Sequence, residues 1–92
     1  MTDLLIIRRC AEAMKDESAA ALEFLEEGHR GGYEPLHDDA QAMALVKKFR
    51  LQILEWRGDA DWCVRYSDSN QSFNDDLNRA ICECVAKMGE AK

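Results

Sequence analysis

RLQILEWRGDADWCVRYS, residues 50–67, decides the fold, because it has the pattern of a β-hairpin. The first strand has apolar side chains on both faces, Leu51 and Ile53 on one face and Leu54 and Trp56 on the other. A turn follows at residues 58–60, where Gly58 can adopt a positive φ, and the second strand alternates. Because both faces of the first strand are apolar, we expect helices on both sides of the sheet. The sequence therefore predicts an α+β fold, a short antiparallel sheet centred on the hairpin (50–67) and packed between helices.

Three amphipathic segments supply these helices. The first covers residues 2–15, with Thr2 as N-cap, and the second begins at Asp38 or Asp39 and ends at Phe49. Residues 68–73 are polar and lack apolar periodicity, so a loop is expected there. The last helix has a capping pattern at Ser72 and Asp75, and Gly89 is expected to end it.

Residues 18–27 are compatible with two structures. Their alanine, leucine and glutamate residues favour a helix that begins at Ser18. Leu22 and Phe24 also alternate, and a strand here would give the hairpin the third partner that a stable sheet needs. We favour the helix and keep the strand as the alternative.

Size and charge limit the classes of function. A chain of 92 residues is expected to form a single domain, 1–92, with little room for a deep active-site cavity. A net charge of −6 argues against direct binding of nucleic acid, which needs a basic surface. The N-terminal residues resemble neither a signal peptide nor a membrane span, and the four cysteines fit buried, reduced thiols. We therefore expect a soluble protein of the cytoplasm that does not bind membranes.

About the last sixty residues contain an aromatic residue, a Pro-Leu pair and two aspartates that open a helix, then an Arg-Ala-Ile helix that ends near a glycine, namely Tyr33, Pro35, Leu36, Asp38, Asp39, Arg79, Ala80, Ile81 and Gly89. By these motifs this part of the sequence resembles a group of short proteins from phages and prophages of Gram-negative bacteria. Ala40 stands where that group usually has a glycine. The group resembles the phage ABA-sandwich domain, which implies a sheet between helices. It implies no catalytic residues.

Candidate catalytic and metal-binding residues are few. The residues with metal-ligand side chains are His29, His37, Asp38 and Asp39, but paired aspartates before an apolar helix are typical N-caps, which is the interpretation we favour. Cys82 and Cys84 diverge by about 200° on a helix and cannot share one ion. Cys63 with His29 as its base is the weakest of the alternatives. We therefore predict no catalytic residues, no metal and no cofactor.

Two groups of residues are candidates for binding. The first would contact a partner protein through an acidic surface and two tryptophans at the hairpin tip, namely Glu23, Glu26, Glu27, Glu34, Trp56 and Trp62. The structural alternatives are a solvated acidic face and a cross-strand pair of packed tryptophans. The second group would bind an anion such as a nucleotide through a glycine-rich loop, namely His29, Arg30, Gly31 and Gly32. For this loop the alternative is a flexible connector.

These observations predict a non-enzymatic phage or prophage accessory protein that binds and modulates a host protein, for example by inhibiting a defence system. The alternative is an oligomeric protein that binds or sequesters a small ligand such as a nucleotide. A homo-oligomer is also expected, because a short sheet leaves an edge strand unpaired.

Overall fold

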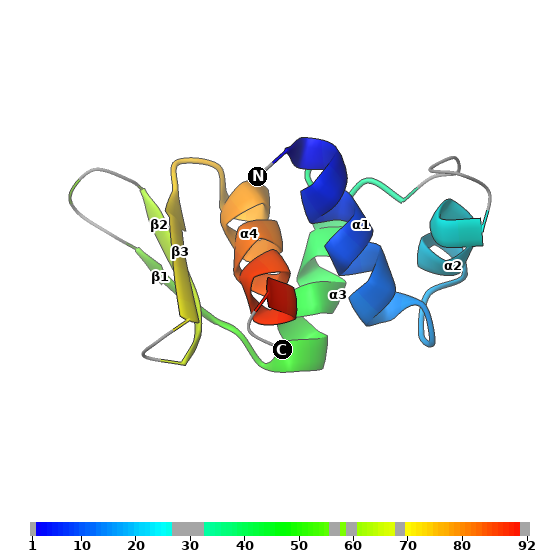
Figure 1. Ribbon diagram of the computed structural model, residues 1–92. Coiled ribbons are helices and arrows are strands. Elements are labelled where there is room, and N and C mark those ends of the chain that lie inside the picture. Colours follow the sequence, from blue (N-terminus) through cyan, green and yellow to red (C-terminus); the bar gives the residue numbers. More distant parts are fainter. Residues whose placement is uncertain (1, 27–32, 56–57, 59–60, 68–69, 91–92) are drawn as a thin grey trace.

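The computed structural model describes residues 2–26, 33–55, 58, 61–67 and 70–90 (Figure 1). Its elements, in chain order, are α1 (Asp3–Met14), α2 (Ala19–Glu26), α3 (Asp39–Phe49), β1 (Gln52–Glu55), β2 (Trp62–Ser67), β3 (Asn70–Asn74) and α4 (Leu77–Glu90). The strands form one antiparallel sheet in the order β1-β2-β3. The predicted α+β fold with an antiparallel sheet centred on the hairpin is confirmed.

Side-chain caps explain where the first three helices begin. The hydroxyl of Thr2 accepts a hydrogen bond from the backbone N–H of Leu5 (3.3 Å) at the start of α1. Asp38 does the same for Gln41 (3.0 Å) at the start of α3. The hydroxyl of Ser18 accepts a hydrogen bond from the N–H of Ala21 (3.2 Å) at the start of α2. Residues 19–26 therefore form the helix that we favoured, and the strand alternative is wrong.

The hairpin follows α3 directly. Arg50 ends the helix in a left-handed conformation (φ 53°), which turns the chain into β1. The register pairs Gln52 with Arg65 and Glu55 with Trp62. Trp62 therefore has Glu55 as its cross-strand partner, and the expectation that it lies opposite Trp56 is wrong. The predicted turn at 58–60 lies largely outside the described residues, which include Gly58 alone of the three.

The third strand comes from residues 70–74, where the sequence predicted a loop. That prediction is wrong because antiparallel pairing with β2 satisfies the backbone of a polar segment that carries little apolar pattern. The predicted cap of the last helix is wrong for the same reason: Ser72 lies inside β3 and is fully buried. Asp76 caps α4 instead, accepting from the N–H of Arg79 (3.2 Å). The helix continues to Glu90, so Gly89 does not end it.

Helix α4 lies in the middle of the molecule, between the sheet on one side and α1 and α3 on the other, and α2 lies at the far end (Figure 1). Its residues 80–82 and 84–86 are all buried, as expected for a helix that is covered all round. Alanine and cysteine at four of these six positions allow close approach of its neighbours. The expectation of helices on both faces of the sheet is therefore corrected: the sheet has α4 on one face.

The core is continuous from α4 into the other helices. It includes Ile6 and Cys10 of α1, Phe24 of α2 and Leu45 of α3. All four cysteines are free and buried, as the sequence predicted. Among the described residues, no helix has both the length and the apolar character needed to cross a membrane.

Candidate functional site

Two rows of side chains form the face of the sheet that points away from α4. Side chains alternate between faces along a strand, and cross-strand partners share a face. Val64 and Ser72 are paired and fully buried, and Asn74 donates to Glu83 of α4 (3.3 Å), so these residues mark the covered face. The opposite face carries an apolar row and a polar row; we call it the uncovered face, and its residues are Leu54, Cys63, Phe73, Gln52, Arg65 and Gln71.

The apolar row crosses all three strands. Leu54 on β1 pairs with Cys63 on β2, which pairs with Phe73 on β3. Cys63 has no exposed surface, whereas Leu54 and Phe73 are 39% and 45% exposed. An aliphatic side chain and an aromatic ring, both partly exposed to solvent, therefore lie on the two sides of a buried thiol.

The polar row borders this apolar row. Nε of Arg65 donates to Oε1 of Gln52 across the strands (2.9 Å), and Sγ of Cys63 donates to Oε1 of Gln71 (3.6 Å). Arg65 is the charged member of the uncovered face, which has no carboxylate among the residues defined above. In a chain with 18 acidic residues and a net charge of −6, this face is neutral to positive.

The predicted partner-binding residues do not form one surface. Glu23 and Glu26 are exposed on α2, at the opposite end of the molecule from the sheet, along a longest dimension of 40 Å (Figure 1). Trp62 lies on β2, partly buried against the core, which is the packing role weighed above. Glu34 precedes α3, and its carboxylate lies 3.4 Å from Nδ1 of His37. Glu27 and Trp56 lie outside the described residues.

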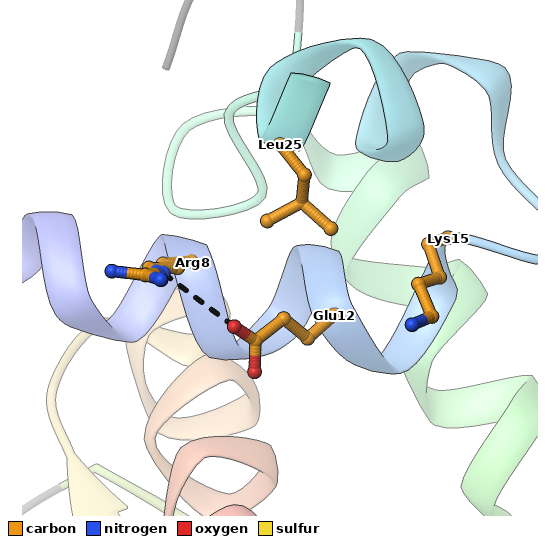
Figure 2. A pocket seen from close by; sticks show the side chains of 4 residues that line it. All are labelled: Arg8, Glu12, Lys15 and Leu25. Carbon is orange, nitrogen blue, oxygen red and sulfur yellow. Dashed lines mark ion pairs between the residues drawn. The ribbon is translucent and has the colours of Figure 1, made fainter. Parts of the chain in front are cut away.

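The predicted anion-binding loop, His29, Arg30, Gly31 and Gly32, also lies outside the described residues. A shallow groove of about 410 Å³ does lie between α1 and α2, lined by Arg8, Glu12, Lys15 and Leu25. Figure 2 shows Leu25 above the outer face of α1, where Arg8 and Glu12 form an ion pair (3.5 Å) one turn from Lys15. The groove thus combines two cations, one carboxylate and an apolar wall.

The buried thiols are unsuited to nucleophilic catalysis. Sγ of Cys10 donates to the backbone carbonyl of Cys82 (3.6 Å). A hydrogen bond with the Cys82 side chain, together with burial, raises the pKa of Cys10 far above its ordinary value of 9.0. Burial also raises the pKa of Cys84. A nucleophilic cysteine needs an accessible thiolate, and both shifts favour the protonated thiol.

The aspartates before α3 have structural partners. Asp38 caps the helix, which confirms the capping interpretation, and Oδ1 of Asp39 accepts from Nδ2 of Asn78 on α4 (2.8 Å). Within the described ranges, no three histidine, cysteine or acidic side chains are grouped so that they could hold a metal ion.

Sequence reasoning missed the uncovered face because it placed Phe73 and Gln71 in a loop. The signal was present but short: Gln71 and Phe73 alternate with Ser72 over a single three-residue run. Comparison of the chain with protein-family models, with curated proteins and with solved structures finds no match.

Proposed function

We propose that this chain is a non-enzymatic binding protein that takes a partner protein onto the uncovered face of its sheet. The observation that carries the proposal is the apolar row from Leu54 to Phe73, half-exposed on a face without a covering helix among the described residues. An apolar centre with a polar border is the usual anatomy of a protein interface, and phenylalanine and arginine are enriched in such centres. A protein surface is therefore the ligand that matches this face.

The charge of the face indicates the chemistry of the partner. Arg65 is held by Gln52 at the border of the apolar row, and none of the six residues that define the face is a carboxylate. A partner surface with an apolar patch next to a carboxylate would bury Leu54 and Phe73 and would add a contact to Arg65 beside those that Arg65 already makes. Such a charge-assisted pair adds specificity to the apolar contact.

The narrower proposal is that the chain is a phage or prophage accessory protein whose partner is a protein of the host cytoplasm. Its support is the sequence resemblance of Tyr33, Pro35 and the Arg79 helix to proteins of that group. The absence of an activated thiol among Cys10 and Cys84 supports a binding role over a catalytic one.

A capture experiment tests the proposal. Tagged wild-type protein, Phe73→Ser and the double variant Glu23→Lys/Glu26→Lys would be incubated with lysate of the native host, and bound proteins quantified by mass spectrometry. All three sites are exposed, so the variants are expected to fold, with circular dichroism as the check. We expect one protein bound in stoichiometric amount by the wild type and by the α2 variant, and at least tenfold less by Phe73→Ser. If Phe73→Ser captures as much partner as the wild type and the α2 variant captures less, the binding site lies at Glu23 and Glu26 of α2 and not on the uncovered face.

The groove between α1 and α2 supports a second candidate, a binder of small anions such as nucleotides. Arg8 and Lys15 supply positive charge, and Leu25 supplies an apolar wall for a base or acyl group. A nucleotide bound there would raise the melting temperature, because ligand binding stabilises the folded state by an amount that grows with the logarithm of the ligand concentration divided by the dissociation constant. The test is a thermal-shift panel in which Lys15→Ala abolishes the shift and Arg65→Ala does not; no shift with any nucleotide in the wild type would reject this candidate.

A further inference from the structure

The two edges of the sheet differ in how their backbone is occupied. At the β3 edge, Nζ of Lys87 donates to the carbonyl of Gln71 (2.9 Å) and Sγ of Cys84 donates to the carbonyl of Asn70 (3.8 Å), both from α4. At the β1 edge, no side chain within the described ranges bonds to the backbone of residues 52–55. The closed edge is thus β3, and the open edge is β1.

An open edge strand is a template for another strand. In an antiparallel pair, alternate residues direct both their N–H and C=O groups away from their partner strand, so β1 presents such groups on its outer side. Natural edge strands often prevent pairing with lysine, proline or a bulge. The sequence of β1, QILE, has no lysine, proline or bulge, and its protection is limited to its length of four residues and to the charge of Glu55 at its end.

We propose that β1 pairs with β1 of a second copy of this chain, antiparallel, with Leu54 opposite its own counterpart. Residues that lie opposite each other in an antiparallel pair point to the same face of the sheet. The two-fold axis that relates the two copies therefore passes through a residue and not between two residues. In the middle of β1 that residue is either Ile53 or Leu54. Ile53 is already partly buried against the core, whereas Leu54 is 39% exposed on the uncovered face. Centring on Leu54 therefore buries the more exposed side chain, and it places Glu55 opposite Ile53, whereas centring on Ile53 would place Glu55 opposite Leu51.

The product is a continuous six-stranded sheet. The apolar rows of both copies join at Leu54, so the row runs from one Phe73 through the dimer axis to the other. Cross-strand partners have Cβ atoms about 4.5–5.5 Å apart, close enough for the two leucines to touch. The contact involves one short strand from each copy, so we expect a reversible dimer that dissociates on dilution. The dimer requires no other protein, so it can be tested with the purified protein alone, although Leu54 also belongs to the proposed partner-binding row.

Cysteine cross-linking of the purified protein tests both the edge and the register. Both cysteine variants are made in a Cys63→Ala background, because Cys63 is the cross-strand partner of position 54 and would compete for the new thiol within one chain. In this background Leu54→Cys is expected to form a disulfide-linked dimer under mild oxidation, because the new thiols face each other, whereas Ile53→Cys stays monomeric on a denaturing gel. The Cys63→Ala protein is the matched control, since its remaining cysteines are buried. Cross-linking of Ile53→Cys instead of Leu54→Cys would overturn the register.

Light scattering tests the dimer without new thiols. At about 100 μM, a concentration at which a dimer with a dissociation constant in the low micromolar range is mostly assembled, the wild type is expected to have twice the monomer mass. Leu54→Lys is expected to be a monomer, because lysine on an edge strand blocks pairing, and Phe73→Lys, in the same row on the closed edge, is expected to remain a dimer. A wild type that is monomeric at this concentration, or a Leu54→Lys variant that is still dimeric, would overturn the proposal.

Discussion

Phe73 on β3 is the cross-strand partner of Cys63 on β2, yet the thiol has no exposed surface and the ring is 45% exposed. The difference arises because Cys63 has a neighbour on each side, Leu54 and Phe73, whereas Phe73 lies on an edge strand, on a face that no helix of the described residues covers. The ring thus shields the thiol and remains accessible itself. This arrangement is the physical basis of the proposed binding surface.

The two faces of the sheet should respond differently to truncation. Val64→Ala removes a fully buried side chain that packs toward α4, and we expect a loss of about 2 kcal/mol in the free energy of unfolding from lost burial and the remaining cavity. Phe73→Ala removes a larger side chain from the uncovered face and should lower it by less than about 1 kcal/mol. Urea denaturation measures both, and a larger loss for Phe73→Ala would mean that the face is covered.

Ser72→Ala should stabilise the protein. The hydroxyl of Ser72 is fully buried on the covered face and has no hydrogen-bond partner among the described residues. A buried hydroxyl without a partner is destabilising, so its removal is expected to raise the free energy of unfolding by about 1 kcal/mol. Thermal unfolding gives the sign directly. A lower melting temperature would show that Oγ has a partner in solution.

The ion pair between Arg79 and Asp3 joins the last helix to the first. Nη1 of Arg79 lies 2.7 Å from Oδ1 of Asp3, and the contact raises the pKa of the guanidinium. The Asp3 side chain is 60% exposed, so solvent screens the pair, and Asp3→Asn should lower the free energy of unfolding by about 0.5 kcal/mol. This loss should shrink in 1 M salt. An equal loss at both salt concentrations would show that the effect is not ionic.

Stability should fall as the pH rises above 9. Hydrogen bonding and burial raise the pKa of Cys10, and burial raises the pKa of Cys84, from an ordinary 9.0. Below pH 9 both thiols are protonated in the folded and unfolded states, and their contribution is fully present. Above it, the unfolded chain loses protons that the folded chain keeps, so Cys10 should lower the free energy of unfolding by about 1.4 kcal/mol per pH unit, and Cys84 should add to the fall between pH 9 and its own raised pKa.

Urea titrations between pH 8 and pH 10 measure that slope. Cys10→Ala should reduce the slope of the free energy of unfolding against pH by the contribution of about one proton. The cavity left by the substitution changes stability at pH 8 but does not change this slope. An unchanged slope in this variant would show that Cys10 ionises in the folded state.

Local signals in the sequence were sufficient for much of the fold. Thr2 and Asp38 predicted the helix starts because a cap acts within one turn, and the alternation around Val64 predicted the hairpin. The position of β3 depends on pairing with β2, and the alternation of Gln71, Ser72 and Phe73 is too short to predict a strand by itself. The exposure of Phe73 depends on which face α4 covers, a tertiary property that alternation alone cannot give.

The predicted site residues illustrate the same limit. Glu23, Glu26 and Trp62 were grouped by residue type, but chain topology places α2 and the sheet at opposite ends of the molecule (Figure 1). The buried, closely packed α4 could have been suspected from Ala80, Cys82 and Cys84, small residues spread around one helix.

Site-specific photo-cross-linking in lysate of the native host tests the central claim most directly. A benzophenone amino acid would replace Phe73 on the uncovered face or, as a matched control, Glu23 on α2, both exposed positions. The account predicts a covalent adduct with one partner protein from position 73 and none from position 23. Adducts from position 23 alone, or none from position 73 while the wild-type protein still captures a partner, would contradict it.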